Sequence, residues 1–253
     1  AASASPSSPR PPAGALVMRR GLLDLPLPER SEHRWRGISA QLANPRLLRA
    51  AAAGSAFVFT FTGTFSYVTF RLEAPPFGYG TAASSAIFLL WLLGALVPWA
   101  GRLAERIGWQ RLALAALVLA ACGLAVSLPE ALPTLALGLA AVALANFAGV
   151  TAAQLGAAEA SAVDRGVASA VYFSLYYTAS ALGGYLPGLA WEAWGWQGVT
   201  ALALAVLASA ALTLLVGPRV RTRGRGSGTP GGGRRWRSAR SGRGRGARSA
   251  LPR

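Results

Sequence analysis

Long apolar segments with short connections between them constrain this chain more than any other feature. Charged residues make up only 13% of its 253 residues, against about a quarter in an ordinary soluble domain. A helix that crosses a bilayer needs about 20 mainly apolar residues, whereas six buried helices of a soluble protein would need a very large water-facing partner. The sequence therefore predicts an all-α integral membrane protein. Six transmembrane helices are expected at residues 47–70, 82–100, 112–128, 134–157, 166–190 and 199–216.

The two flanks of this six-helix bundle have a different composition. Residues 1–46 are rich in Pro, Ser and Arg, and residues 217–253 consist mainly of Arg, Gly and Ser. Such segments have too few apolar residues to form a core. We expect a disordered tail or linker at 1–46, the transmembrane bundle at 47–216 and a second disordered tail at 217–253.

The arginines indicate the orientation in the membrane. With six spans, both termini lie on one side, and that side carries eight arginines up to Arg49, four in the connections and twelve from Arg219 onward. The opposite side carries only Arg71. Because positively charged connections stay in the cytoplasm, we expect a multi-pass protein of the cell inner (plasma) membrane with both termini cytoplasmic.

The net charge of +16 has two interpretations. An Arg/Gly tail can bind RNA, but next to a bilayer it meets anionic lipid headgroups. The arginines avoid the apolar segments, which favours the lipid bilayer as partner and makes nucleic acid an unlikely one.

The scarcity of catalytic residue types argues against an enzyme. His33 is the only histidine and lies in the N-terminal tail, and Cys122 is the only cysteine. A histidine-containing triad in the bilayer, a disulfide and a cysteine-based metal site are thereby excluded. No nucleotide-binding loop is visible either, so we expect no catalytic residue, no metal and no cofactor.

A short stretch occurs twice at a constant offset. Residues 101–110 match residues 188–197, with Gly-Trp-Gln at 108–110 repeated at 195–197. The first copy joins the second and third predicted spans, and the other copy joins the fifth and sixth on the opposite side. Two three-helix repeats of inverted topology would produce this pattern, although a ten-residue window leaves chance similarity as the alternative.

The first copy also carries a family resemblance. Its residues 101–108, Gly-Arg-Leu-Ala-Glu-Arg-Ile-Gly, resemble the cytoplasmic loop signature of the major facilitator superfamily, Gly-x-Leu-Ala-Asp-Arg-x-Gly. Glu105 stands where that signature has Asp, and Trp109-Gln110 replace a basic pair. The resemblance implies a charged loop that holds the cytoplasmic side shut in one state. The residues of this gating loop would be Gly101, Arg102, Glu105, Arg106 and Gly108.

Other segments narrow the resemblance. Residues 65–72 and 74–78 resemble the seventh helix and following loop of bacterial drug or sugar efflux members, and residues 170–177 resemble their eleventh helix. The resemblance covers about residues 25–216 and implies a C-terminal six-helix half. Such a half would need a second six-helix half, from a homodimer or a separate chain, to enclose a pathway.

The implied activity is secondary transport of a small organic solute by alternating access, with the substrate near the bilayer midplane. Polar side chains within the spans are candidates for this pathway because they are costly in lipid, although small hydroxyls also join helices. No Asp, Glu, His, Lys or Arg lies near the middle of a span, so a proton carrier would belong to the other half. The candidates are Thr64, Tyr67, Asn146, Gln154, Tyr172 and Tyr176.

A second function class remains open. The chain would then be a non-transporting membrane remnant, or an anchored interaction protein that acts through its Arg/Gly tail.

Overall fold

The computed structural model describes residues 31–161 and 165–216, and within them every regular element is helical. Residues 1–30, 162–164 and 217–253 lie outside the described part. The predicted Arg/Gly tail and Asp164 are therefore outside it as well. The elements are α2 (Ser31–Leu42), α3 (Pro45–Glu73), α4 (Thr81–Ser85), η1 (Ala86–Leu96), α5 (Val97–Ile107), α6 (Trp109–Val126), α7 (Leu132–Ala160) and α8 (Arg165–Val216).

Four helices of the described part are long and apolar enough to cross a membrane. They are the continuous stretch Ala86–Ile107, which joins η1 to α5, and the helices α6, α7 and α8. The all-helical architecture predicted from the apolar segments is therefore confirmed.

The predicted first span lies in α3, which is not among these four. Its 29 residues include a run of hydroxyl side chains such as Thr60, Thr62 and Thr64, which lower its mean hydropathy. The predicted fifth and sixth spans both lie in α8, but the backbone departs from helical geometry at Trp194 (φ −139°, ψ 15°) and Gly195 (φ 56°, ψ −142°). This is the position at which the sequence predicts a break.

The prediction of a disordered segment up to residue 46 is wrong for residues 31–46. The chain forms α2 there and begins α3 at Pro45. Asn44 caps α3, because its side-chain oxygen accepts hydrogen bonds from the backbone N–H groups of Arg46 and Leu47. Its amide nitrogen donates to the carbonyl of Ala160 at 3.1 Å. A polar contact thus fixes the start of α3 to the end of α7.

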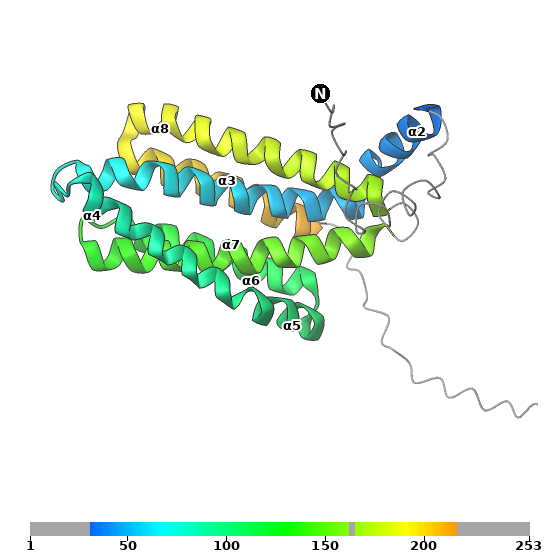
Figure 1. Ribbon diagram of the computed structural model, residues 1–253, viewed down its shortest axis with the longest axis horizontal. Helices are drawn as coiled ribbons and strands as arrows, with labels where there is room; N and C mark the ends of the chain where they lie inside the picture. The colour runs from blue at the N-terminus through cyan, green and yellow to red at the C-terminus, as the bar shows by residue number, and fades with distance from the viewer. Residues whose placement is uncertain (1–30, 162–164, 217–253) are drawn as a thin grey trace, which may run out of the picture. The chain divides into compact units, whose positions relative to one another are not determined.

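Helix α3 packs against both α7 and α8, and α6 packs against α7 (Figure 1). Contacts between side chains show the relative directions of α3, α7 and α8. Gly54 of α3 faces Tyr172 of α8, and Gly63 faces Pro187 further along both helices, so α3 and the first part of α8 run in the same direction. Asn44 meets Ala160 at the opposite end of α7, so α3 and α7 are antiparallel.

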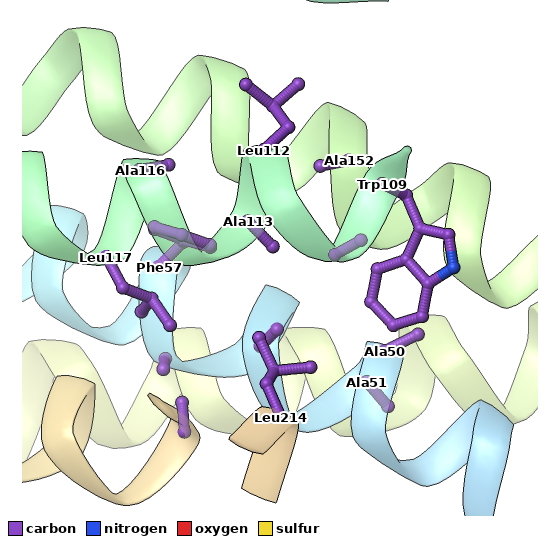
Figure 2. Packing of buried hydrophobic residues seen from close by; sticks show 14 of the residues in the cluster. Ala50, Ala51, Phe57, Trp109, Leu112, Ala113, Ala116, Leu117, Ala152 and Leu214 are labelled. Atoms are coloured by element: carbon purple, nitrogen blue, oxygen red, sulfur yellow. The ribbon is translucent and has the colours of Figure 1, made fainter. Parts of the chain in front are cut away.

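Small side chains dominate the core at one end of these helices. Figure 2 shows Ala50 and Ala51 of α3 facing Trp109 and Ala113 of α6, with Leu214 of α8 alongside. Lipid tails are as apolar as the core itself, so helices in a bilayer associate by close van der Waals packing rather than by a hydrophobic driving force. Alanine and glycine permit that approach.

Helices α6 and α7 approach each other closely where they cross. A Cβ added to Gly123 would lie 2.6 Å from the carbonyl oxygen of Gly138, and a Cβ on Gly138 would meet the backbone of Gly123 in turn. Neither position has room for a side chain unless the two helices move apart.

We therefore expect Gly123→Val to lower the unfolding temperature of the purified protein in detergent. Overpacking of this kind costs about 1–3 kcal/mol. The matched control is Gly101→Ala, also within a helix, where a Cβ meets nothing within 4 Å and better helix propensity stabilises by up to ~1 kcal/mol. Equal unfolding temperatures for the two variants would contradict the packing described here.

Candidate functional site

The candidate residues of α3 are mostly used in packing. Thr64 is buried, and its hydroxyl oxygen has no hydrogen-bond partner among the described residues; the same holds for Thr60 one turn earlier. Tyr67 is half-buried and donates a hydrogen bond to the carbonyl oxygen of Gly184 at 3.2 Å. Its hydroxyl lies over Gly188, so Tyr67 joins α3 to α8.

The two candidate residues of α7 have opposite environments. Asn146 is only 7% exposed, and its amide oxygen has no partner in the described part of the chain. An unpaired buried amide costs free energy, which makes Asn146 a position where a ligand or a water would be favourable. Gln154, two turns further along, is exposed.

On α8, two candidate residues lie together. The rings of Tyr172 and Tyr176 stack with centroids 6.1 Å apart, and Tyr176 also makes edge contacts with Phe173 and Tyr177. Tyr172 is fully buried against α3, since a Cβ on Gly54 would come within 3.0 Å of its ring. Tyr176 is half-buried. Among the described residues, no hydrogen bond or ring contact joins this pair to Thr64, Asn146 or Gln154.

Sequence reasoning missed a second group of rings. The aromatic cluster, as we name it, joins α3, η1 and α7, and Phe61 is at its centre: its ring lies 4.6 Å from Phe65, 5.4 Å from Trp91 and 5.8 Å from Phe147. Trp91 is 49% exposed. Only the juxtaposition of three helices creates the cluster, and periodicity within any one helix does not show it. Its members are Phe61, Phe65, Phe88, Trp91 and Phe147.

The predicted gating loop is helical. Gly101, Arg102, Glu105 and Arg106 all belong to the last turns of α5, and Gly108 alone, at φ +89°, separates α5 from α6. Arg102, Glu105 and Arg106 are exposed, and within the described part none of them forms an ion pair. The guanidinium of Arg102 lies 5.8 Å from the Trp99 ring.

At the other end of the helices, Arg71 fixes three elements to one another. Its guanidinium donates hydrogen bonds to the carbonyl oxygens of Leu128 at 2.8 Å and Pro129 at 3.2 Å, in the connection between α6 and α7. It also lies 5.2 Å from the Trp196 ring, and the indole N–H of Trp196 donates to the carbonyl oxygen of Ser127 at 3.1 Å. We call this arrangement the Arg71 clasp.

A small cavity of about 170 Å³ lies beside the clasp. Burial of the guanidinium lowers the pKa of Arg71 from its ordinary value, and the nearby carboxylate of Glu130 opposes that shift. Arginine stays protonated in proteins, so the clasp keeps its positive charge. The rings of Phe77, Trp191 and Trp196 also line the cavity, together with Glu130 and residues 74–76.

We expect Arg71→Gln to lower the unfolding temperature by the equivalent of about 1.5–3 kcal/mol, because hydrogen bonds to a charged donor are lost from two carbonyl groups. The matched control is Arg111→Gln on exposed Arg111, which should change stability by less than ~0.5 kcal/mol.

The effects of Arg71→Gln and Trp196→Phe on the free energy of unfolding should be non-additive, since both residues hold the same connection between α6 and α7. Additive losses in thermal unfolding would refute the clasp as one unit.

Comparison with known proteins gives two partial similarities. The chain is 26% identical over 144 residues to the uncharacterized MFS-type transporter YybF of Bacillus subtilis (strain 168). The aligned residues cover 56% of this chain and 36% of the relative. It is also 26% identical over 167 residues to an uncharacterized transporter of Buchnera aphidicola subsp. Schizaphis graminum (strain Sg), covering 66% of this chain and 40% of that protein.

The matched regions span about a third to two fifths of these two relatives. No protein-family model matches the chain, and no solved structure matches it. The apolar helices and the two similarities together indicate an integral membrane protein that is similar to transporters, one of them of the major facilitator type.

Proposed function

We propose that this chain is the C-terminal six-helix half of a secondary transporter of the major facilitator type, most like bacterial drug or sugar efflux members, and that it moves a small organic solute by alternating access. The observation that carries the proposal is the 144-residue similarity to an MFS-type transporter. The major-facilitator signature predicted from sequence lies at residues 101–108, at the end of α5.

Helix lengths support six crossings of the bilayer. At about 1.5 Å per residue, the 29 residues of α3 extend roughly 43 Å, more than the ~30 Å hydrocarbon core requires. Helix α8 has 52 residues and a break at Trp194–Gly195, so it is long enough to cross twice. The two parts of α8 and the helix α3 complete the set of six.

Two similar helix starts support the inverted repeat. Gly108 and Gly195 both have positive φ, and each precedes a Trp that opens the next helical segment. Trp109 and Trp196 are both buried, the first with Leu47 and Ala50 in one core cluster and the second in another. A buried tryptophan at the start of the next helical segment in each half is what an inverted repeat would produce.

The proposed pathway combines hydroxyl, amide and aromatic groups. Asn146 has an unpaired buried oxygen, Tyr176 is half-buried beside other rings, and the aromatic cluster is partly exposed. An uncharged or weakly polar organic solute fits such groups better than a strongly charged one. A second six-helix half would close the pathway. The proposed pathway residues are Thr64, Tyr67, Asn146, Gln154, Tyr172 and Tyr176.

The charged end of α5 would then act as a gate. Arg102, Glu105 and Arg106 are exposed and make no ion pair with the described residues, so they are available to a facing helix. Charge pairs at such an interface can break and form again between two states.

The proposal is tested by solute accumulation in bacteria that express the chain and lack their own broad efflux pumps. Expressing cells should retain less of at least one uncharged aromatic solute than cells with an empty vector. Tyr176→Ala should weaken this export about threefold to tenfold, because an aromatic contact contributes ~0.5–1.5 kcal/mol. The control is Tyr185→Ala, which removes a 65% exposed tyrosine of the same helix.

Equal retention in expressing and empty-vector cells across the solute panel would overturn the transport proposal. Export that Tyr176→Ala and Tyr185→Ala impair equally would remove Tyr176 from the pathway.

The proposed orientation, with both termini in the cytoplasm of a plasma membrane, has a separate test. In a Cys122→Ser background, a membrane-impermeant maleimide on intact cells should label Tyr79→Cys, which follows α3, but not Arg111→Cys. Both positions are exposed. Arg111→Cys should react only after the membrane is permeabilised, because α5 ends on the arginine-rich side. The reverse labelling pattern would contradict the orientation.

A further inference from the structure

A groove of about 580 Å³ lies between α5, α6 and α7, near the connection at Gly108. Figure 1 shows these three helices adjacent to one another. Leu144 and Ala148 of α7 line the groove together with residues of η1, α5 and α6. None of the candidate pathway residues lines this groove, whereas two residues of the proposed gate, Arg102 and Arg106, do.

The groove has one charged end. Arg102 and Arg106 line it, and they lie one turn apart on α5, so their side chains share a helix face. Both are exposed, and neither pairs with an acidic side chain in the described part of the chain. Glu105 lies between them in sequence but does not line the groove. The end of the groove therefore has two positive charges with no acidic partner among the described residues.

The remainder of the groove is apolar. It extends along α6 from Leu112 to Leu119, which is about 10 Å at 1.5 Å per residue. Ala115 and Ala116 between them have short side chains, which leaves space along the wall. A hydrocarbon chain fits a groove of this length and chemistry.

The expected depth of the two arginines in the membrane indicates which ligand the groove could bind. The stretch Ala86–Ile107 is apolar enough to cross the bilayer, and the two arginines lie in its last two turns. Basic side chains at that depth meet the phosphate groups of lipids. Trp99, which is 68% exposed and lies beside Arg102, is a residue type enriched at the same interface.

We propose that the groove binds one anionic phospholipid of the surrounding bilayer. Its phosphate group accepts hydrogen bonds from Arg102 and Arg106, and one acyl chain lies along Leu112 and Leu119. The proposal requires a membrane-embedded chain but not transport activity, so it stands or fails separately from the proposed function.

The test is native mass spectrometry of the full chain in detergent, titrated with phosphatidylglycerol and with phosphatidylcholine of the same acyl length. We expect one phosphatidylglycerol to remain bound where phosphatidylcholine does not. At roughly fivefold per positive charge near the surface, Arg102→Gln with Arg106→Gln should weaken phosphatidylglycerol binding about 25-fold. Arg111→Gln, which removes an exposed arginine just outside the groove, should leave binding unchanged.

A second pair of variants tests the apolar part. Ala115→Phe fills the groove from an exposed position, whereas Ala208→Phe adds the same side chain at an exposed position of α8. Only Ala115→Phe should abolish retention of the lipid. Both proteins should keep their elution volume in size-exclusion chromatography, which shows that they remain folded.

Three results would overturn the proposal. Equal binding of the two lipids would show that the arginines do not select a headgroup, and an equal loss with Arg111→Gln would show a diffuse surface effect. Unchanged lipid binding in Ala115→Phe would show that the acyl chain lies elsewhere, and a second copy of the chain would then be the occupant to consider.

Discussion

The separation between helices depends on residues without large side chains. Gly123 and Gly138 bring the backbones of α6 and α7 together, and Gly54 admits the ring of Tyr172 between α3 and α8. In a bilayer the hydrophobic effect does not drive helices together, so the quality of this contact determines whether the bundle forms. Three large rings of the core lie against glycines in this way: Tyr172 at Gly54, Phe57 at Gly149 and Trp109 at Gly156.

The same close packing explains where the polar groups are found. Some hydroxyls between helices bond to one another or to the backbone: Thr62 and Ser180 are 3.2 Å apart, and Thr151 donates to the carbonyl of Phe147 at 2.7 Å. The hydroxyls of Thr60 and Thr64 and the amide oxygen of Asn146 are different, because they are buried without a partner among the described residues. Such exceptions mark positions where packing alone does not account for the residue.

The two ends of the helices differ in chemistry. At the end near Ser127, the side chains of Arg71 and Trp196 donate hydrogen bonds to backbone carbonyls of the chain itself. At the end near Gly108, Arg102 and Arg106 have no acidic partner in the described part. The first end is thus closed by internal contacts, whereas the second is available to ligands or to other helices. The clasp was not predicted, because Leu128 and Ser127 contribute backbone carbonyls that leave no trace in residue type.

The sequence by itself determined the helical class, the position of most helix ends and the break at Trp194–Gly195, because apolar runs, prolines and glycines act locally. It misjudged residues 31–46, where composition suggested disorder and contacts with α7 and α8 supported a helix. Only the tertiary structure decided which polar residues meet. Tyr172 and Tyr176 stack within one helix, whereas the aromatic cluster, the Arg71 clasp and the groove beside α5 each combine residues from at least three separate elements. A one-dimensional pattern does not encode the crossing of helices, since rotation and separation depend on how glycine and alanine surfaces fit together.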